Sequence, residues 1–268
     1  MPSVCLATAL YEKTYNHYIE NDKLRVWLNK FNYPFDEIII LFNNISQEGF
    51  EECVKYLQTF TDKKITFAFS QSMTDEVIST FKLDPNYHNL PGYWYSIANF
   101  AQLVISKSDY VMYICEDISI VHPSDTFVKD SIEALENNPD CIATSMNWSW
   151  IGADPKTKLG HDAGEEEEWY TKPKHKNDKF YLTNGFGDHI YFSSREKLLS
   201  IDYNTSHPFV NRFPGYSGQS FDKRLNSYQT IHEMYRYVHK KLHYSHIGWN
   251  LYLKDLNLEV QPFSIIDK

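Results

Sequence analysis

Residues 109–123 of this chain read DYVMYICEDISIVHP. The apolar, β-forming run at 110–115 leads directly into two neighbouring carboxylates, Glu116 and Asp117. A strand commonly ends in turn-forming residues, whereas this one ends in concentrated negative charge. Ligands of open α/β sheets bind at the carboxyl ends of the strands, where paired carboxylates suit a divalent cation that in turn holds a diphosphate. This stretch therefore points to an enzyme that handles nucleotide-activated substrates.

Strands and helices are expected to alternate through the first half of the chain. Short apolar runs predict buried strands at 4–10, 36–42, 65–70 and 110–115. Apolar residues at helical spacing predict helices at 15–31, 46–60 and 93–106. A polar loop is expected between the third strand and the third helix. Such alternation is typical of a mostly parallel, doubly wound sheet.

The second half is less regular. Its pattern predicts helices at 124–137, 194–201 and 221–243, and strands at 141–146 and 187–192. The polar stretch 147–179 contains the acidic run Glu165–Glu168, which we interpret as a solvated loop rather than a metal site. The stretch 203–221 is expected to form a binding loop.

The chain shows no internal repeat and no linker. We therefore expect one domain, residues 1–268, with a nucleotide-binding half (1–123) and an acceptor-binding half (124–268).

Composition narrows the class of protein. The 268 residues are 42% hydrophobic and 16% aromatic, so a large core can form. The formal net charge of −9 argues against non-specific attraction to nucleic acid or anionic membranes. The four cysteines form no CxxC pair, which favours buried free thiols. No apolar run approaches the roughly 20 residues of a membrane span, and the first residues lack a basic leader, so we expect a cytoplasmic protein without stable membrane insertion.

The sequence lacks the phosphate-binding and nucleophile motifs of several enzyme classes. The sequence has no P-loop, no GxGxxG and no GxSxG, which argues against kinases, dehydrogenases and serine hydrolases. A sugar-nucleotide pyrophosphorylase would carry a glycine-rich loop after the first strand, whereas residues 8–13 contain no glycine.

The order of elements in residues 4–123 resembles the GT-A fold glycosyltransferases, particularly family-2-like members. Four places carry the resemblance: the opening strand, 4–11; the second strand with its polar end, 36–46; Asn99, on the helix before Asp109; and EDISIVHP at 116–123. The last stretch is similar to the Glu-Asp-Asp form of the DXD-type motif. The resemblance implies an α/β protein of the GT-A class. Its Rossmann-like, mostly parallel central sheet would have flanking helices and a less regular acceptor half.

This resemblance also implies a glycosyltransferase, either a hexosyl- or a pentosyltransferase, which takes sugar from a nucleotide-sugar, with a UDP-sugar favoured. The implied contacts to the nucleotide-sugar are Thr8, Ala9, Asn43, Asn99, Glu116 and Asp117. A glycan is the favoured acceptor, with a modified nucleic acid or a protein as alternatives. The rival hypothesis is a catalytically inactive GT-A-like protein that binds nucleotides or carbohydrates.

A divalent cation, Mn²⁺ or Mg²⁺, is implied by the same resemblance, with Asp117, Glu116 and the late His246 as candidate ligands. One departure leaves metal dependence open: Ile118 stands where the Glu-Asp-Asp form has its metal-binding carboxylate. Neighbouring side chains of an extended segment point to opposite faces. We therefore expect that Glu116 and Asp117 do not grip one ion together. Alternatively, the two only end the strand and cap the next turn.

Two aspartates are candidates for the base that activates an acceptor hydroxyl. Asp188 lies in the glycine-containing stretch 184–192, and Asp222 lies in GQSFDKRL at 218–225; both segments resemble acceptor-side elements of glycosyltransferases. The alternatives are an Asx turn for Asp188 and a first-turn helix charge for Asp222.

Other residues could also serve a site. His239 and His243 stand at i and i+4 and would share one face of the predicted helix 221–243. That spacing can bind a metal, although the neighbouring basic residues favour an ordinary solvated helix. Trp148, Trp150 and Trp169 could form a sugar platform or belong to the core.

Overall fold

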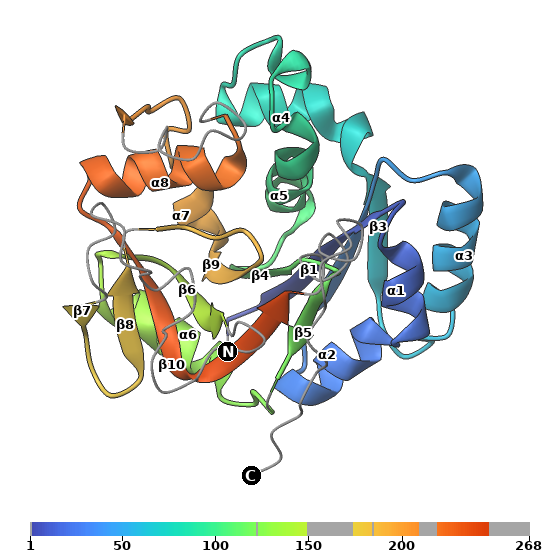
Figure 1. The fold of residues 1–268 in the computed structure, drawn as a ribbon, viewed down its shortest axis with the longest axis horizontal. Helices are drawn as coiled ribbons and strands as arrows, with labels where there is room; N and C mark the ends of the chain where they lie inside the picture. Colours follow the sequence, from blue (N-terminus) through green and yellow to red (C-terminus); the bar gives the residue numbers. More distant parts are fainter. Residues whose placement is uncertain (1, 122, 149–173, 184, 209–218, 247–268) are drawn as a thin grey trace, which may run out of the picture.

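The computed structural model describes residues 2–121, 123–148, 174–183, 185–208 and 219–246. They form an α/β fold built on one mixed sheet of ten strands (Figure 1). The strand order is β3-β2-β1-β4-β9-β6-β10-β8-β7, and β5 pairs with β10 beside this path. This architecture confirms the predicted fold class, and one continuous sheet runs through both halves of the chain.

The strands are mostly short and carry the apolar runs that the sequence places in the interior. Their bounds are β1 Val4–Tyr11, β2 Glu37–Asn43, β3 Ile65–Phe69, β4 Tyr110–Ile114, β5 Ile118–Ile120, β6 Cys141–Trp148, β7 Lys174–His175, β8 Phe180–Thr183, β9 Ile190–Ser194 and β10 Tyr235–His246.

The helices of the described residues flank this sheet. Their bounds are α1 Tyr15–Glu20, α2 Lys23–Phe31, α3 Gln47–Leu57, α4 Thr74–Phe81, α5 Tyr93–Ile105, α6 Phe127–Asn137, α7 Arg195–Leu199 and α8 Phe221–Ile231, with short 3₁₀ turns at Ser70–Met73 and Tyr87–Asn89. None of them has both the length and the apolar character that crossing a bilayer requires.

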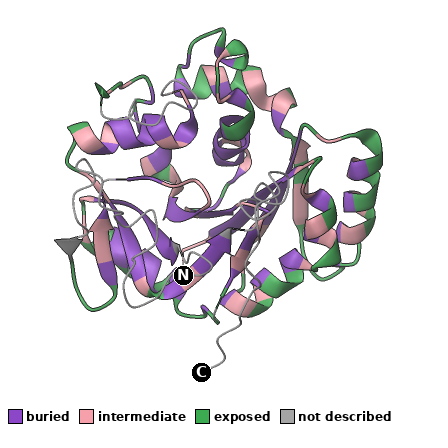
Figure 2. Ribbon diagram, in the orientation of Figure 1, coloured by how far each residue is buried: buried purple, intermediate pink, exposed green. Residues whose placement is uncertain are grey.

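Strands β3, β2, β1 and β4 are parallel to one another. Alternate residues of each strand enter different cores, as the two-residue period of a strand requires. In β1, Val4 and Leu6 pack on the core beneath α1, α2, α3 and α6, whereas Cys5 and Ala7 pack on the core beneath α4, α5, α7 and α8. The buried residues consequently form layers on both faces of the sheet (Figure 2).

Strand β9 runs antiparallel to β4, and Ile190 pairs with Ile114. The residues just before β9 therefore lie at the same edge of the sheet as the residues just after β4. Strand β10 pairs with β6 and β8 in its first part and with β5 in its last part. Its register shifts between His239 and His243, which allows one strand to serve these successive partners.

Three helix predictions differ from the structure. The predicted helix 15–31 is two helices, because Asp22 adopts a left-handed backbone with φ of 45°. The polar loop predicted after β3 contains α4, whose aliphatic and aromatic side chains at Val77 and Phe81 are buried. The predicted helix 221–243 ends at Ile231, and β10 follows after a left-handed Glu233. Pairing with three strands overrides the helical spacing of residues 235–243.

Candidate active site

The carboxylates predicted from the sequence lie in a tight turn. Strand β4 ends at Ile114, and the amide of Ile118 donates to the carbonyl of Cys115 at 3.1 Å. In this carboxylate turn, residues 115–118, one potential ligand atom from each of Cys115, Glu116 and Asp117 lies within 4.8 Å of the other two. The segment that was expected to be extended is a turn, so the alternation that would point the side chains of Glu116 and Asp117 to opposite faces does not apply.

Glu116 is buried, with 4% of its surface exposed, and its Oε1 accepts a short hydrogen bond from the Thr14 hydroxyl. Burial raises the pKa of Glu116 to about 8, and the negative charge of Asp117 adds to this rise. The Thr14 bond and the charge of Lys23 act in the opposite direction. A positive group entering the turn would therefore relieve an unfavourable negative charge.

Two basic groups that the sequence analysis missed face this turn. Lys23 is 4% exposed, and its Nζ donates to the carbonyl of Ile118 and to the hydroxyl of Ser119, each at 2.9 Å. Burial lowers the pKa of Lys23 to about 8, while Asp117 and Glu116 raise it. The pKa of His17 is lowered by burial and by Lys23, and raised by Asp117.

No local signal distinguishes these two residues. Within a continuous helix 15–31 they would be ordinary polar positions, and only the break between α1 and α2 gives Lys23 its place.

The two candidate bases come together beside the turn. Asp188 precedes β9, and its carbonyl accepts from the Cys115 thiol at 3.5 Å, while the Cys115 amide donates to the carbonyl of His189 at 2.8 Å. Asp222 lies in the first turn of α8 and accepts a short hydrogen bond from Ser220. Burial raises the pKa of Asp222 to about 7, and the charge of Asp188 adds to the rise. Elements far apart in sequence thus place two acidic groups near the carboxylate turn.

Asn43 and Tyr11 pair with each other at the carboxyl ends of β2 and β1. The Asn43 amide donates to the carbonyl of Trp94 at 2.6 Å, and the Tyr11 hydroxyl donates to the same carbonyl at 3.0 Å. Burial raises the pKa of Tyr11 well above its usual range, and Glu116 contributes to this rise. These contacts place Asn43 at the same edge of the sheet as the carboxylate turn.

The other predicted nucleotide contacts are buried, as Asn43 is. Thr8 and Ala9 are in the interior of β1 and are fully buried. Asn99 is also buried; its Oδ1 accepts from the Tyr191 hydroxyl at 3.1 Å and its Nδ2 donates to the Tyr95 carbonyl at 3.3 Å. Asn43, Thr8, Ala9 and Asn99 are thus all buried side chains, and their contact with a nucleotide stays a prediction.

The late histidines lie on β10 rather than on a helix. His246 pairs through its backbone with Ile118, the residue after Asp117. His239 and His243 flank the register shift of β10, so the shared helix face predicted for them does not exist. Trp148 ends β6, whereas Trp150, Trp169 and the acidic run Glu165–Glu168 lie outside the described residues.

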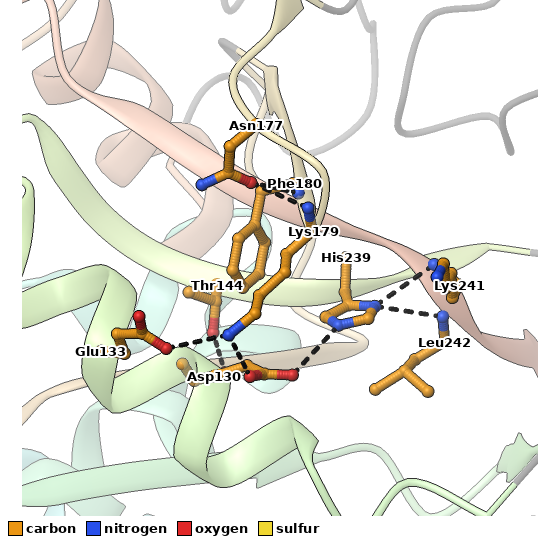
Figure 3. Close-up of polar contacts among 10 residues, drawn as sticks. Asp130, Glu133, Thr144, Asn177, Lys179, Phe180, His239, Lys241 and Leu242 are labelled. Atoms are coloured by element: carbon orange, nitrogen blue, oxygen red, sulfur yellow. Dashed lines mark hydrogen bonds and ion pairs between the residues drawn. The ribbon is translucent and has the colours of Figure 1, made fainter.

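His239 belongs to a network that we call the α6–β10 cluster, in which Asp130 and His239 are buried and Glu133 and Lys179 are exposed (Figure 3). Its Nδ1 accepts from the backbone amides of residues 241 and 242, both at 3.2 Å, and its Nε2 lies 3.4 Å from Asp130. Lys179 contacts Asp130 at 2.7 Å and Glu133 at 2.9 Å. This cluster anchors the irregular part of β10 to α6.

The pKa values of the α6–β10 cluster follow from these contacts. Burial alone would raise the pKa of Asp130, but hydrogen bonds from Lys179 and Thr126, with the charge of Lys179 and that of His239 when it is protonated, outweigh it and lower the pKa. Burial lowers the pKa of His239, against the influence of Asp130. A neutral His239 with its proton on Nε2 satisfies both sides of the ring.

The carboxylate turn fits an oxygen-preferring divalent cation. Mn²⁺ and Mg²⁺ favour carboxylate ligands, and Glu116 and Asp117 bring two carboxylates together. Burial raises the pKa of the Cys115 thiol well above its usual range, so the neutral sulfur is a poor ligand for such ions. Glu116 and Asp117 are therefore the described residues that could hold the cation.

Solved structures similar to this chain include glycosyltransferases, and the chain has the GT-A fold. No family model and no curated protein matches the sequence.

Among the similar structures, the apo form of mouse xyloside xylosyltransferase 1 gives a TM-score of 0.50 at 12% identity, covering 88% of this chain and 84% of that one. The Pyrobaculum calidifontis mannosyltransferase PcManGT, in complex with GDP-Man and Mn²⁺, gives 0.52 at 14% identity, covering 97% of this chain and 66% of the other. GalNAc-T7 with UDP, GalNAc and Mn²⁺ gives a TM-score of 0.50 at 8% identity, covering 92% of this chain and 44% of that one. At these identities the likeness establishes the fold, and activity must be argued from the site.

Proposed function

We propose that this chain is a glycosyltransferase that moves a sugar from a nucleotide-sugar to an acceptor hydroxyl. The carrying observation is that Glu116 and Asp117 share one edge of the sheet with Asp188 and Asp222. Residues 1–123 would hold the donor, and residues 124–268 would hold the acceptor. Such a reaction needs a base for the acceptor hydroxyl and a positive charge for the departing diphosphate; Asp188 or Asp222 could supply the base, and Glu116 and Asp117 could hold a cation.

For the donor, Thr8, Ala9, Asn43 and Asn99 remain the proposed contacts, and Tyr11, which pairs with Asn43, would mark the nucleotide end of the site. A UDP-sugar is the favoured donor. The similar structures with GDP-Man and with UDP support a nucleotide-sugar in general.

A divalent cation, Mn²⁺ or Mg²⁺, would be held by Glu116 and Asp117, with His246 as a third candidate because its backbone lies opposite Ile118. When bound, the cation would neutralise negative charge on the departing diphosphate. The chain's own contribution is to keep the two carboxylates close together in a turn shielded from water, where electrostatic interactions are strong.

On the acceptor side, Asp222 is the proposed base and Asp188 is its partner. A pKa near 7 suits a base that works at neutral pH. The Asp222 carboxylate would take the proton from the acceptor hydroxyl as that oxygen bonds to the anomeric carbon. The bond from this carbon to the diphosphate oxygen breaks, and the diphosphate leaves with the electron pair. Such a single displacement inverts the anomeric configuration.

Donor hydrolysis tests the proposal without knowledge of the acceptor. Purified protein is incubated with UDP- and GDP-sugars, with and without Mn²⁺, and release of nucleoside diphosphate is measured. Thermal-shift measurements with UDP and GDP run in parallel. Turnover that depends on Asp117 and persists in the exposed control Asp62→Asn would support the proposal. Nucleotide binding without any turnover would favour the inactive binding protein instead.

A further inference from the structure

Lys23, the first residue of α2, is almost completely buried. Removing an ammonium group from water is costly unless fixed partners replace its hydration. Here the Nζ donates to the Ile118 carbonyl and the Ser119 hydroxyl, each at 2.9 Å. Both partners directly follow Asp117 in the chain, so the ammonium is held against the carboxylate turn.

The break between α1 and α2 is built to place Lys23 there. Asp22 has a left-handed φ of 45°, a conformation that costs energy for a residue with a side chain. The Asp22 carboxylate accepts from the Tyr56 hydroxyl at 2.7 Å and from Arg25 Nε at 2.8 Å. Two hydrogen bonds thus maintain an unfavourable backbone at the residue before Lys23.

Ile118 binds Lys23 through its backbone carbonyl, and its side chain carries no charge. Its side chain is fully buried in the core beneath α2, and its carbonyl accepts from Lys23. Lys23 therefore brings a positive charge to a turn that has two carboxylates, Glu116 and Asp117. Those two carboxylates attract the Lys23 ammonium most strongly among its charged neighbours.

We infer that Lys23 is a built-in counter-cation of the carboxylate turn, which positions Glu116 and Asp117 and opposes the binding of a divalent cation to them. The inference rests on the proposed cation site at these two residues. An ammonium satisfies the carboxylates through the same attraction that a metal uses, and it repels the metal itself. The free protein would then bind the cation weakly, and the negative diphosphate of a donor would strengthen that binding.

Two substitutions separate the charge of Lys23 from its hydrogen bonds. Lys23→Gln keeps an N–H donor for the Ile118 carbonyl but loses the charge, and Lys23→Met loses both. Binding of Mn²⁺ to the full chain is measured by the paramagnetic resonance signal of the free ion, without donor or acceptor. Lys55→Met, at an exposed position of α3, is the matched control.

We expect Lys23→Gln to bind Mn²⁺ about threefold to tenfold more tightly than the unaltered chain, because one repelling charge is gone. Lys55→Met should leave the affinity unchanged. If Lys23→Met folds, it should also bind Mn²⁺ more tightly than the unaltered chain. If it does not fold, the Mn²⁺ affinity of Lys23→Gln alone tests the inference. An unchanged or weaker affinity of Lys23→Gln, including no binding by either protein, would overturn the inference. Because no sugar is transferred in this experiment, its outcome is independent of the test of glycosyl transfer.

Discussion

The carboxylate turn and the α6–β10 cluster both hold buried acidic groups, and they treat them in opposite ways. In the α6–β10 cluster, Lys179 and His239 surround Asp130 and lower its pKa in spite of burial. In the carboxylate turn, burial and a second carboxylate raise the pKa of Glu116 to about 8 in spite of Lys23. The first arrangement stabilises the ionised acid, and the second makes ionisation of Glu116 unfavourable unless a cation is present.

The extent to which neighbouring charges compensate a buried acid therefore indicates whether that acid serves stability or function. A buried acid whose partners fully compensate it has little to gain from a ligand. A buried acid pair with incomplete compensation gains when a cation arrives, and such perturbed groups gather at functional sites. The same holds for Asp222, which burial and Asp188 bring to a pKa of about 7.

The largest effect should come from Asp222→Asn. Removing the proposed base should lower kcat/KM by about a hundredfold, or roughly 2.7 kcal/mol of barrier. The base form of Asp222 increases above pH 7, so the rate of the unaltered enzyme should rise between about pH 6 and pH 8, and the variant should lose this rise. The measurement is kcat/KM for nucleoside diphosphate release against pH.

Asp188→Asn checks the assignment within this pair. It should shift the rise in rate to lower pH, because the pKa of Asp222 falls when the neighbouring charge is gone. A complete loss of the rise in Asp188→Asn, with Asp222→Asn active, would reverse the two roles.

The second-largest effect should be on the stability of the fold, and it tests the α6–β10 cluster. Asp130→Asn should lower the free energy of unfolding by about 2 kcal/mol at pH 7, since the largely buried Asp130 carboxylate loses its charged hydrogen bond from Lys179. The folded state lowers the pKa of Asp130, so this stabilisation is present at neutral pH and is lost as the pH falls through that lowered value. Urea unfolding at pH 7 and pH 3 measures it.

The exposed neighbour Glu133 is the control, because Glu133→Gln should cost under about 0.5 kcal/mol. Donor turnover in Asp130→Asn should stay within about twofold of the unaltered enzyme. A large loss of turnover at unchanged stability would break the contrast between the two regions.

The third effect concerns Asp117. Asp117→Asn should reduce turnover at least about tenfold, or roughly 1.4 kcal/mol, because its charge serves the leaving diphosphate. The exposed Asp125→Asn should be near normal. Initial rates with and without Mn²⁺ provide the measurement, and near-normal activity in Asp117→Asn would remove this residue from the mechanism.

The smallest effect should be a gain in stability. The folded state raises the pKa of Glu116 above its unfolded value, so ionising Glu116 destabilises the fold as the pH rises from about 4.5 toward 8. Glu116→Gln should therefore raise the free energy of unfolding by about 1 kcal/mol at pH 8 and change it little at pH 4. Thermal unfolding in a metal chelator tests the sign, and a loss of stability at pH 8 would contradict it.

Much of the first half of the fold could be predicted from local patterns. The apolar runs of β1, β2 and β4 are short and clearly bounded. The helix predicted from residue 46 is α3, and Ser46 caps it, since its hydroxyl accepts from the amide of Gly49. The division of residues 15–31 was not predictable, because the left-handed backbone of Asp22 depends on contacts with Tyr56 that the local sequence does not show.

The second half depends on distant partners, and prediction failed there. Residues 235–243 have a spacing that suits a helix, but they pair with β6 and β8. At the site, Glu116 and Asp117 were recognisable because charge follows an apolar strand. Lys23 was not, because its role depends on the folded position of Ile118 and Ser119.

The reversed direction of β9 has a consequence for when activity can arise during synthesis. Strand β4, which leads into Glu116 and Asp117, pairs with β1, and β1 is synthesised earlier. Asp188 reaches the two carboxylates only after β9, which is synthesised later, has aligned with β4. Closing that long loop carries an entropic cost and slows pairing. A nascent chain could therefore present its acidic turn before its acceptor side exists, and the enzyme would become competent only in the last stages of folding.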